Sequence, residues 1–452
     1  MTRTTRGPMR LVAIIAALML MAVACGGGGD EPDDSAQPPP AGGTDTGAQG
    51  PDLSGVELEV AVVPTGTEAE LFGAVFDAFE ERTGATVTLT STGDDMAAVI
   101  GPRIAGGDPP DVALLPQPGL LRDLAEQGAL QPLGEVASDE VDEHYAPIWR
   151  ELGSVDGELY GVWFKAANKS LVWYDTAVFE DAGIEPVDTL EGFLEAARTV
   201  TDSGVPALSV GGADGWTLTD WFENVYLRTA GPEMYDKLAA HEIPWTDPSV
   251  TTALETLGEI FTPELLAGGT QGALQTDFNT SVTQVFSDPP EAAMVYEGDF
   301  VSAIITGETE AELGTDADVF PFPEIEGSGP AVVAGGDVAV LLSDTEGGRA
   351  LIEYLASPAA GEVRAALGGF ISPNQSVDPA TYPDEVTRTI AESLEEAGDN
   401  LRFDLSDLQP PAFGGTPSQG MWQILQDFLA DTSDVQATAE ALEAAAASAY
   451  GS

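Results

Sequence analysis

The sequence predicts an α/β fold built from two lobes, and three observations support this. Short apolar runs typical of buried strands alternate with amphipathic runs of helical period, the pattern of a mostly parallel sheet covered by helices. Roughly 400 residues follow a Gly- and Pro-rich stretch that ends near residue 55, and a chain of that length divides into two domains or lobes. The single cysteine excludes an internal disulfide, so the fold must depend on its apolar core.

The first alternation of strands and helices is expected between residues 56 and 115. The run VELEVAVV is apolar enough for a buried strand, and the spacing of Thr67 and Glu70 predicts a capping box at the start of the next helix. Gly84 is a suitable C-cap for that helix. The expected elements are strands at 56–63, 87–90 and 111–115 and helices at 67–83 and 95–105.

The same alternation continues through the rest of the chain. The segment GVWFKAANKSLVWYD, at 161–175, is a long apolar crossing interrupted by polar residues. Asp247-Pro248 predicts a helix with proline at its first position. The other expected elements are helices at 189–200, 357–369 and 435–450 and strands at 205–210, 291–299 and 332–342.

A secretory signal peptide is expected at residues 1–24. Three arginines and no acidic residue come before the apolar run Leu11–Ala24. This run is shorter than the ~20 residues that a membrane-spanning helix needs. The lone cysteine, Cys25, follows directly. Residues 25–55 are rich in Gly, Pro, Asp and Ser and have almost no aliphatic side chain, so they are expected to form a flexible tether.

Cys25 lies in a sequence that resembles the lipobox of bacterial lipoproteins. In AVAC the small Ala24 fits that motif, whereas Ala22 stands where these proteins most often have Leu. The resemblance implies that Cys25 carries lipid and anchors the protein to the extracytoplasmic face of the cell membrane, since more than one acyl chain gives stable anchoring. Ordinary signal-peptidase cleavage beside an incidental cysteine is the alternative.

The charge is strongly acidic. The chain has 16 Lys and Arg against 76 Asp and Glu, a formal net charge of −60. Such a surface repels nucleic acid and anionic lipid, so neither is expected as a partner. The excess also means that two neighbouring carboxylates are no indication of acid–base catalysis.

Motifs of catalysis and metal binding are missing from the sequence. There is no G-x-S-x-G, H-E-x-x-H or C-x-x-C motif and no Gly-rich phosphate loop, and the two histidines, His144 and His241, lie in unrelated contexts. We therefore expect a binding protein that is not an enzyme and has no cofactor and no metal.

Two clusters carry the binding hypothesis. The first is WFKAANKSLVWY, which holds Lys165 and Lys169, two of only three lysines in the chain. They either lie along the surface and pair with local acids or, with Asn168, donate hydrogen bonds into a cleft. Lysine is so rare in this chain that we expect at least one such donor in a cleft.

The second cluster is GGADGWTLTDWFENVY, where two tryptophans stand among threonines and acids. The C–H faces of a sugar suit an aromatic plate beside carboxylates. Both rings could instead belong to the core. We expect Trp216, next to the Gly-rich turn, to be the plate and Trp221, followed by Val225 and Leu227, to be the core residue.

Several stretches in fixed order resemble the extracellular solute-binding proteins of carbohydrate ABC importers, and most of all the alpha-glucoside-binding members. They are KAANKSLVWYD, GWTLTDWFENVYLRTAGPEMYDK, HEIPWTDPSV, FSDPPEAAMVYEGDF, FPFPEI, GGDVAVL, YLASP, GGFISPN and FRFDLSDLQP. The ordered set covers nearly all of the chain after residue 55.

The resemblance implies a type II periplasmic-binding-protein fold with ligand in the cleft between two lobes. Lobe one would comprise 56–164 and 331–374, and lobe two 165–330 and 375–452, with crossings at FKAANK and VVAGGD. It further implies a monomeric, lipid-anchored receptor that captures a di- or oligosaccharide by hinge closure and delivers it to permease subunits.

Position within the matching stretches implies the ligand contacts. The candidates are Thr65, Gly66, Thr67, Gln117, Lys165, Asn168, Lys169, Trp216, Asp220, Trp221, Glu297, Asp299, Phe300, Asp337, Phe413 and Trp422.

Two other functions stay open at this point. An extracellular glycosidase lipoprotein would need two carboxylates ~5–9.5 Å apart and measurable turnover. A binding protein for another solute, such as a phosphorylated polyol or a peptide, is the other, although phosphate favours several Arg or Lys donors and this candidate site has two lysines.

Overall fold

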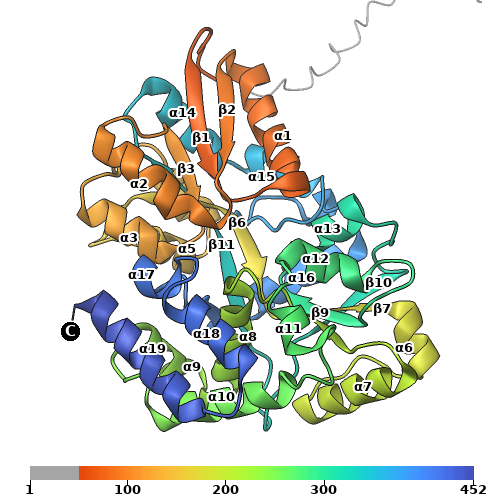
Figure 1. Cartoon of the computed structure of the whole chain (residues 1–452). Coiled ribbons are helices and arrows are strands. Elements are labelled where there is room, and N and C mark those ends of the chain that lie inside the picture. The colour runs from red at the N-terminus through yellow and green to blue at the C-terminus, as the bar shows by residue number, and fades with distance from the viewer. Residues whose placement is uncertain (1–49, 452) are drawn as a thin grey trace, which may run out of the picture. The chain divides into compact units, whose positions relative to one another are not determined.

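The computed structural model of the protein describes residues 50–451 (Figure 1). The expected signal peptide, Cys25 and nearly all of the tether lie outside the described residues. Among those described, no helix is both long and apolar enough to span a bilayer.

The first sheet has the strand order β12-β11-β3-β1-β2, and β6 also pairs with β11. The β1 strand is parallel to β2 and β3, whereas β11 runs antiparallel to β3 and β6. This sheet is therefore mixed, with a parallel part at its N-terminal strands. Its strands are β1 (Glu57–Val62), β2 (Thr86–Ser91), β3 (Val112–Leu115), β6 (Gly161–Asn168), β11 (Val332–Leu341) and β12 (Leu401–Phe403).

Helices cover this sheet, with α1 on one side of β1 and β2 in Figure 1 and α2 and α3 on the other. The elements around it are α1 (Gly66–Thr83), α2 (Met96–Gly106), α3 (Pro118–Glu126), α4 (Ser138–His144), α5 (Pro147–Leu152), the hairpin β4 (Ser154–Val155) and β5 (Glu158–Leu159), α14 (Glu346–Ala356), α15 (Pro358–Ala365) and α16 (Glu385–Glu396).

The ends of α1 show one confirmed prediction and one wrong one. The helix ends at Gly84, whose φ of 76° lies in the left-handed region that glycine adopts without penalty. The capping box is wrong. The N-cap is Thr65 and makes no side-chain capping bond, because the helix begins before Thr67, which lies inside its first turn.

The second sheet has the order β10-β7-β9-β8 and is smaller. Its strands are β7 (Leu171–Asp175), β8 (Leu208–Ser209), β9 (Met294–Glu297) and β10 (Ala317–Pro321). The helices of this part are α6 (Thr176–Ala182), α7 (Leu190–Ser203), α8 (Trp216–Ala230), α9 (Pro232–Ala239), α10 (Pro248–Ile260), α11 (Gly269–Ala273), α12 (Phe278–Val285), α13 (Val301–Glu308), α17 (Pro411–Gly414), α18 (Gly420–Ala430) and α19 (Val435–Tyr450).

Helix α8 is the centre of this second part. It is buried along nearly its whole length and packs against α10, α9 and α18 (Figure 1). Trp221 is 1% exposed and contacts the rings of Phe261, Tyr296 and Phe322. The helix α10 begins as its sequence predicts, with Asp247 capping the N–H of Ser249 ahead of a proline.

Three segments pass between the two sheets. The first joins β6 to β7 at residues 168–171, the second enters β11 at Val332, and the third leaves β12 at Phe403. Residues 375–400, expected to belong with lobe two, instead contact the first sheet's side. Gln375 bonds the carbonyl of His144, and α16 packs against β6.

Two glycines let the first and second crossings lie against each other. A Cβ on Gly335 would come within 2.9 Å of the Lys169 side chain, and a Cβ on Gly336 within 2.1 Å of the Lys165 carbonyl oxygen. The pairing of β6 with β11 also shifts register between Asp337 and Val338. A side chain at 336 would force the crossings apart, and one at 335 would displace the side chain of Lys169.

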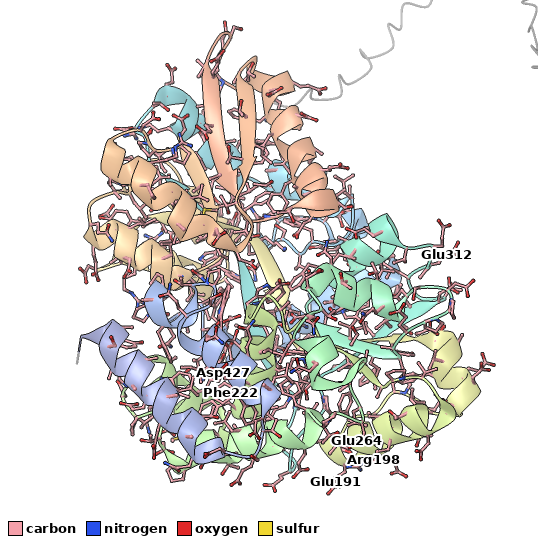
Figure 2. All side chains as sticks on the ribbon, in the orientation of Figure 1. Glu191, Arg198, Phe222, Glu264, Glu312 and Asp427 are labelled. Carbon is pink, nitrogen blue, oxygen red and sulfur yellow. The ribbon has the colours of Figure 1, made fainter. Side chains whose placement is uncertain are left out.

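Carboxylates cover the outside of the molecule, as at Glu191, Glu312 and Asp427 in Figure 2. A formal charge of −60 makes the folded state repel itself, and salt screens that repulsion. We predict that the melting temperature rises by about 5 °C or more between about 0.05 M and about 1 M NaCl. Differential scanning calorimetry measures it, with sucrose at equal osmolality as the uncharged control. A melting temperature that salt leaves unchanged or lowers would contradict this.

Candidate functional site

A cavity of about 470 Å³ lies where the two parts of the fold meet. Segments that follow β1 and β3 form one wall, and the starts of α8, α12 and α13 contribute to the other. The crossings form its floor. Ten of the residues predicted as ligand contacts line it: Thr65, Thr67, Gln117, Lys165, Lys169, Trp216, Asp220, Phe300, Asp337 and Trp422.

The other six predicted contacts do not line the cavity: Gly66, Asn168, Trp221, Glu297, Asp299 and Phe413. Three of them support the framework. Trp221 is a core residue, Phe413 packs its ring on Trp245, and Gly66 is the first residue of α1.

Asn168 and Asp299 tie the first crossing to the segment after β9. The backbone N–H of Asn168 donates to Asp299 Oδ1 at 2.7 Å, and its side-chain amide donates to Ser393 Oγ at 3.0 Å. The Asn168 side chain also accepts from the N–H of Ser170. Its polar groups therefore hold the crossing in place.

Lys165 comes from β6 and is neutralised by acids from two other elements. Its Nζ atom lies 2.5 Å from Glu68 Oε1, on α1, and 3.9 Å from Asp337 Oδ2, on β11. It also stands 5.0 Å from the centre of the Phe300 ring. Burial lowers the pKa of Lys165, but these carboxylates more than offset that effect and raise it above its usual value.

Lys169 is the second cation, and its surroundings are more acidic. Its Nζ atom lies 2.6 Å from Asp404 Oδ2 and 3.1 Å from Asp220 Oδ2, and 5.5 Å from the centre of the Trp216 ring. Burial opposes its charge, but Asp220 and Asp404 hold the pKa of Lys169 well above its usual value. It is therefore a fixed positive charge.

The carboxylates around Lys169 form the densest buried charge cluster of the site. Oxygens of Asp220, Glu223 and Asp404 lie within 4.8 Å of one another, close enough to hold a metal ion. The oxygens of Asp404 and Glu223 already have donors, and Asp220 Oδ1 accepts from Lys169. Asp404 accepts from Ser406 Oγ and Lys169, and Glu223 accepts from the N–H groups of residues 405 and 406. The donor set thus fits an ammonium group rather than a metal.

The cluster contains more acids than Lys169 can neutralise, so some of these acids have raised pKa values and one has a lowered pKa. Burial raises the pKa of Asp220 to about 8, and burial with neighbouring carboxylates raises that of Glu223. Burial would raise the pKa of Asp404 as well, but Lys169 and the donors around it lower it to about 2. Asp404 therefore carries the negative charge that faces the lysine.

Glu297 differs from the others because it has no protein donor. Both of its carboxyl oxygens are buried without an N–H or O–H donor among the described residues, and its side chain faces that of Asp220. Burial and Asp220 raise its pKa well above the usual value. The Glu297 carboxyl therefore favours its protonated, neutral form.

Aromatic rings form a wall beside these charges. Trp216, Phe278 and Phe300 lie in mutual contact, with ring centres 5.1 to 6.2 Å apart. Trp216 is the first residue of α8, and Gly215 precedes it with a φ of 85°. A Cβ at 215 would approach the Trp422 side chain to 2.8 Å, so glycine allows this tight turn.

Sequence reasoning missed much of the acidic lining. The cavity also contacts Glu68, Asp94, Asp214, Asp277, Phe278, Asn279, Glu308, Asp404, Ser406 and Asp407. Asp404 and Asp407 lie in FRFDLSDLQP, a stretch that carried the family resemblance without any residue being singled out. Asp277 could have been found as the N-cap of α12, which its side chain caps.

Comparisons with known proteins agree with this geometry. The family described as bacterial extracellular solute-binding protein matches residues 64–362. The chain belongs to this family. This confirms the family resemblance, and the expected function as a solute receptor with it.

Two relatives match over most of their length. The Osmoprotective compounds-binding protein GgtB of Synechocystis is 37% identical over 403 residues, which is 86% of this chain and 94% of the relative. The Alpha-glucosides-binding periplasmic protein AglE of Rhizobium meliloti is 35% identical over 406 residues, 86% and 87% of the two chains. Both are binding proteins by name.

Solved structures confirm the fold. The bacterial solute receptor AcbH superposes with a TM-score of 0.77 at 20% identity and covers 87% of this chain and 98% of its own. Maltose-bound MalE3 of T. maritima gives 0.70 at 16% identity, covering 86% and 98%. The expected type II periplasmic-binding-protein fold with two lobes is therefore correct.

The neutral state of Glu297 leads to a pH-dependent prediction. A carboxyl whose pKa is raised in the folded state contributes stability that is lost as pH rises from the unfolded pKa toward the folded one. Replacing Glu297 with the isosteric, uncharged Gln removes this loss. Relative to the parent, Glu297→Gln should gain unfolding free energy as pH rises above about pH 5, by at most about 1.4 kcal/mol per pH unit.

Urea unfolding of both proteins between about pH 5 and about pH 8 measures this difference. Glu312→Gln, at an exposed carboxylate, is the matched control and should follow the parent at every pH. A Glu297→Gln profile parallel to that of the parent would show that Glu297 is ionised in the folded protein.

Proposed function

We propose that this protein is the sugar-binding receptor of an ABC importer and that it captures a di- or oligosaccharide, an alpha-glucoside, in the cavity between its lobes. The observation that carries the proposal is the pairing of an aromatic wall with a dense polar floor. Trp216, Phe278 and Phe300 offer apolar surface to the C–H faces of a sugar ring, while carboxylates and two lysines offer partners to its hydroxyls.

The relatives support the choice of ligand class. One is named for alpha-glucosides and the other for osmoprotective compounds, and each is more than a third identical to this chain. The ten cavity-lining residues predicted from the sequence are proposed as the ligand contacts, together with Phe278 and Glu68.

Hinge closure is the proposed mechanism. The cavity is bounded by both parts of the fold, and the three crossings join them. The packing of residues 375–400 on the first sheet's side supports a lobe one that comprises 56–164 and about 331–403. Rotation about the crossings would enclose a bound sugar.

A lipid on Cys25 completes the proposal, with the chain between Cys25 and Leu53 as the tether between the membrane and the lobes. The tether expected from the sequence ends at residue 55, but Leu53 is buried in the core and its N–H donates to the carbonyl of Thr83. The protein would then act as a monomer at the extracytoplasmic face of the cell membrane and pass its ligand to permease subunits.

Trp216→Ala tests the aromatic wall, and Trp221→Ala is its matched control. Removing a ring that stacks on sugar should weaken binding by about 2–4 kcal/mol, or thirty- to a thousandfold, with little loss of stability. Removing the core ring of Trp221 should cost about 3–5 kcal/mol of unfolding free energy and leave the affinity of the folded protein almost unchanged.

Calorimetric titration with maltose, trehalose and sucrose, together with thermal melting of each variant, measures both effects. Unchanged affinity in Trp216→Ala would contradict the stacking role. Release of glucose from maltose or trehalose by the purified protein would show hydrolysis and would replace the receptor proposal with a glycosidase.

A further inference from the structure

The cavity is unusual in how it presents positive charge. Lys165 and Lys169 are the only basic residues that line it among the described residues. Each is already paired with two carboxylates, Lys165 with Glu68 and Asp337 and Lys169 with Asp220 and Asp404. Neither lysine that lines the cavity is therefore free to bind an anion.

A third cationic side chain nearby is also held by protein partners. Arg364 lies behind the cavity, fully buried, and donates to the carbonyl oxygens of Gly368 and Gly369 at 2.6 and 3.2 Å. Its guanidinium group also covers the rings of Phe72 and Phe370. It does not line the cavity, so it cannot reach a ligand there.

The remaining ionisable groups on the wall are all acids. They are Asp94, Asp214, Asp277, Glu308 and Asp407. An anionic ligand would enter a site of like charge with no unpaired cation to receive it, which is strongly unfavourable in a partly buried cleft. Hydroxyl groups, by contrast, donate well to carboxylate oxygens.

We propose that the cavity accepts neutral, hydroxyl-rich saccharides and rejects anionic ones, and that Glu68 and Asp337 set this selectivity by masking Lys165. This inference rests on the proposed function and adds its charge class. Glu68 is the principal mask because it makes the direct contact, at 2.5 Å, from a helix of the wall opposite α8. Specificity of this kind depends on a penalty against the wrong ligand as much as on contacts to the right one.

The test compares ligands that differ only in charge. Trehalose and methyl α-glucoside are the neutral probes, and trehalose 6-phosphate and methyl α-glucuronide are their anionic counterparts. At about pH 7.5 the parent should bind the neutral member of each pair at least about a hundredfold more tightly. Glu68→Gln unmasks Lys165 with little change of shape and should narrow that ratio about tenfold or more.

Glu308→Gln is the matched control, because it removes one negative charge from the same cavity. Among the described residues, Glu308 accepts a hydrogen bond from Asn279 and forms no ion pair with either lysine. Its ratio of neutral to anionic affinity should narrow clearly less than that of Glu68→Gln, because Glu308 adds to the negative charge of the wall but does not mask a lysine. Asp337→Asn provides a second unmasking variant if Glu68→Gln melts earlier than the parent.

Inorganic phosphate gives a readout that needs no sugar. Glu68→Gln should bind it detectably, whereas the parent and Glu308→Gln should not. Equal binding of both members of a pair by the parent would overturn the inference while leaving the receptor proposal intact. If Glu308→Gln narrowed the ratio of neutral to anionic affinity as much as Glu68→Gln does, the masking role of Glu68 would be overturned. Binding of no neutral sugar at all would overturn the proposed function and the inference with it.

Discussion

The arrangement of the cavity depends on one ammonium group, that of Lys169. The residue lies in the first crossing, its side chain passes over Gly335 in the second, and its charge meets Asp404 at the start of the third. The same group bonds Asp220 on α8. One side chain therefore contacts all three connections between the sheets and the central helix of the second part. Without it, several buried carboxylates would share a site with no counter-charge, which is among the costliest arrangements in a protein interior.

The position of the aromatic wall follows from that contact. Asp220 lies one helical turn after Trp216, so fixing Asp220 also fixes the start of α8 and the indole above it. Phe278 and Phe300 then pack against the indole from the starts of α12 and α13. The charged floor and the apolar wall are thus held together by the same contacts, and a ligand in the cavity meets both. The crossings beneath pack closely, because Gly336 lets backbone lie against backbone and Gly335 leaves room for the Lys169 side chain.

Local signals predicted the fold well, and rarity predicted part of the site. Some features depend only on residues that are neighbours in the chain, so they can be recognised in the sequence. These are the alternation of strands and helices, Gly84 as a C-cap and Asp247-Pro248 as a helix start. Lys165 and Lys169 stood out because lysine is so scarce. The acids that pair with them did not, since 76 carboxylates look alike until long-range packing selects Glu68 and Asp404. Glu297 and Asp299 were expected to contact ligand, but both are buried and neither lines the cavity, whereas their neighbour Phe300 does. No period in the sequence reveals a distinction of one or two residues.

The central claim is that two lobes close around a sugar held in this cavity. Small-angle X-ray scattering of the protein, alone and with a saturating concentration of the α-glucoside that binds it most tightly, tests that claim directly. The account predicts a smaller radius of gyration with sugar bound, together with an unchanged circular dichroism spectrum, because the crossings bend while the sheets and helices stay intact. Identical scattering profiles at full occupancy would contradict it and would mean that the ligand binds without movement of the lobes.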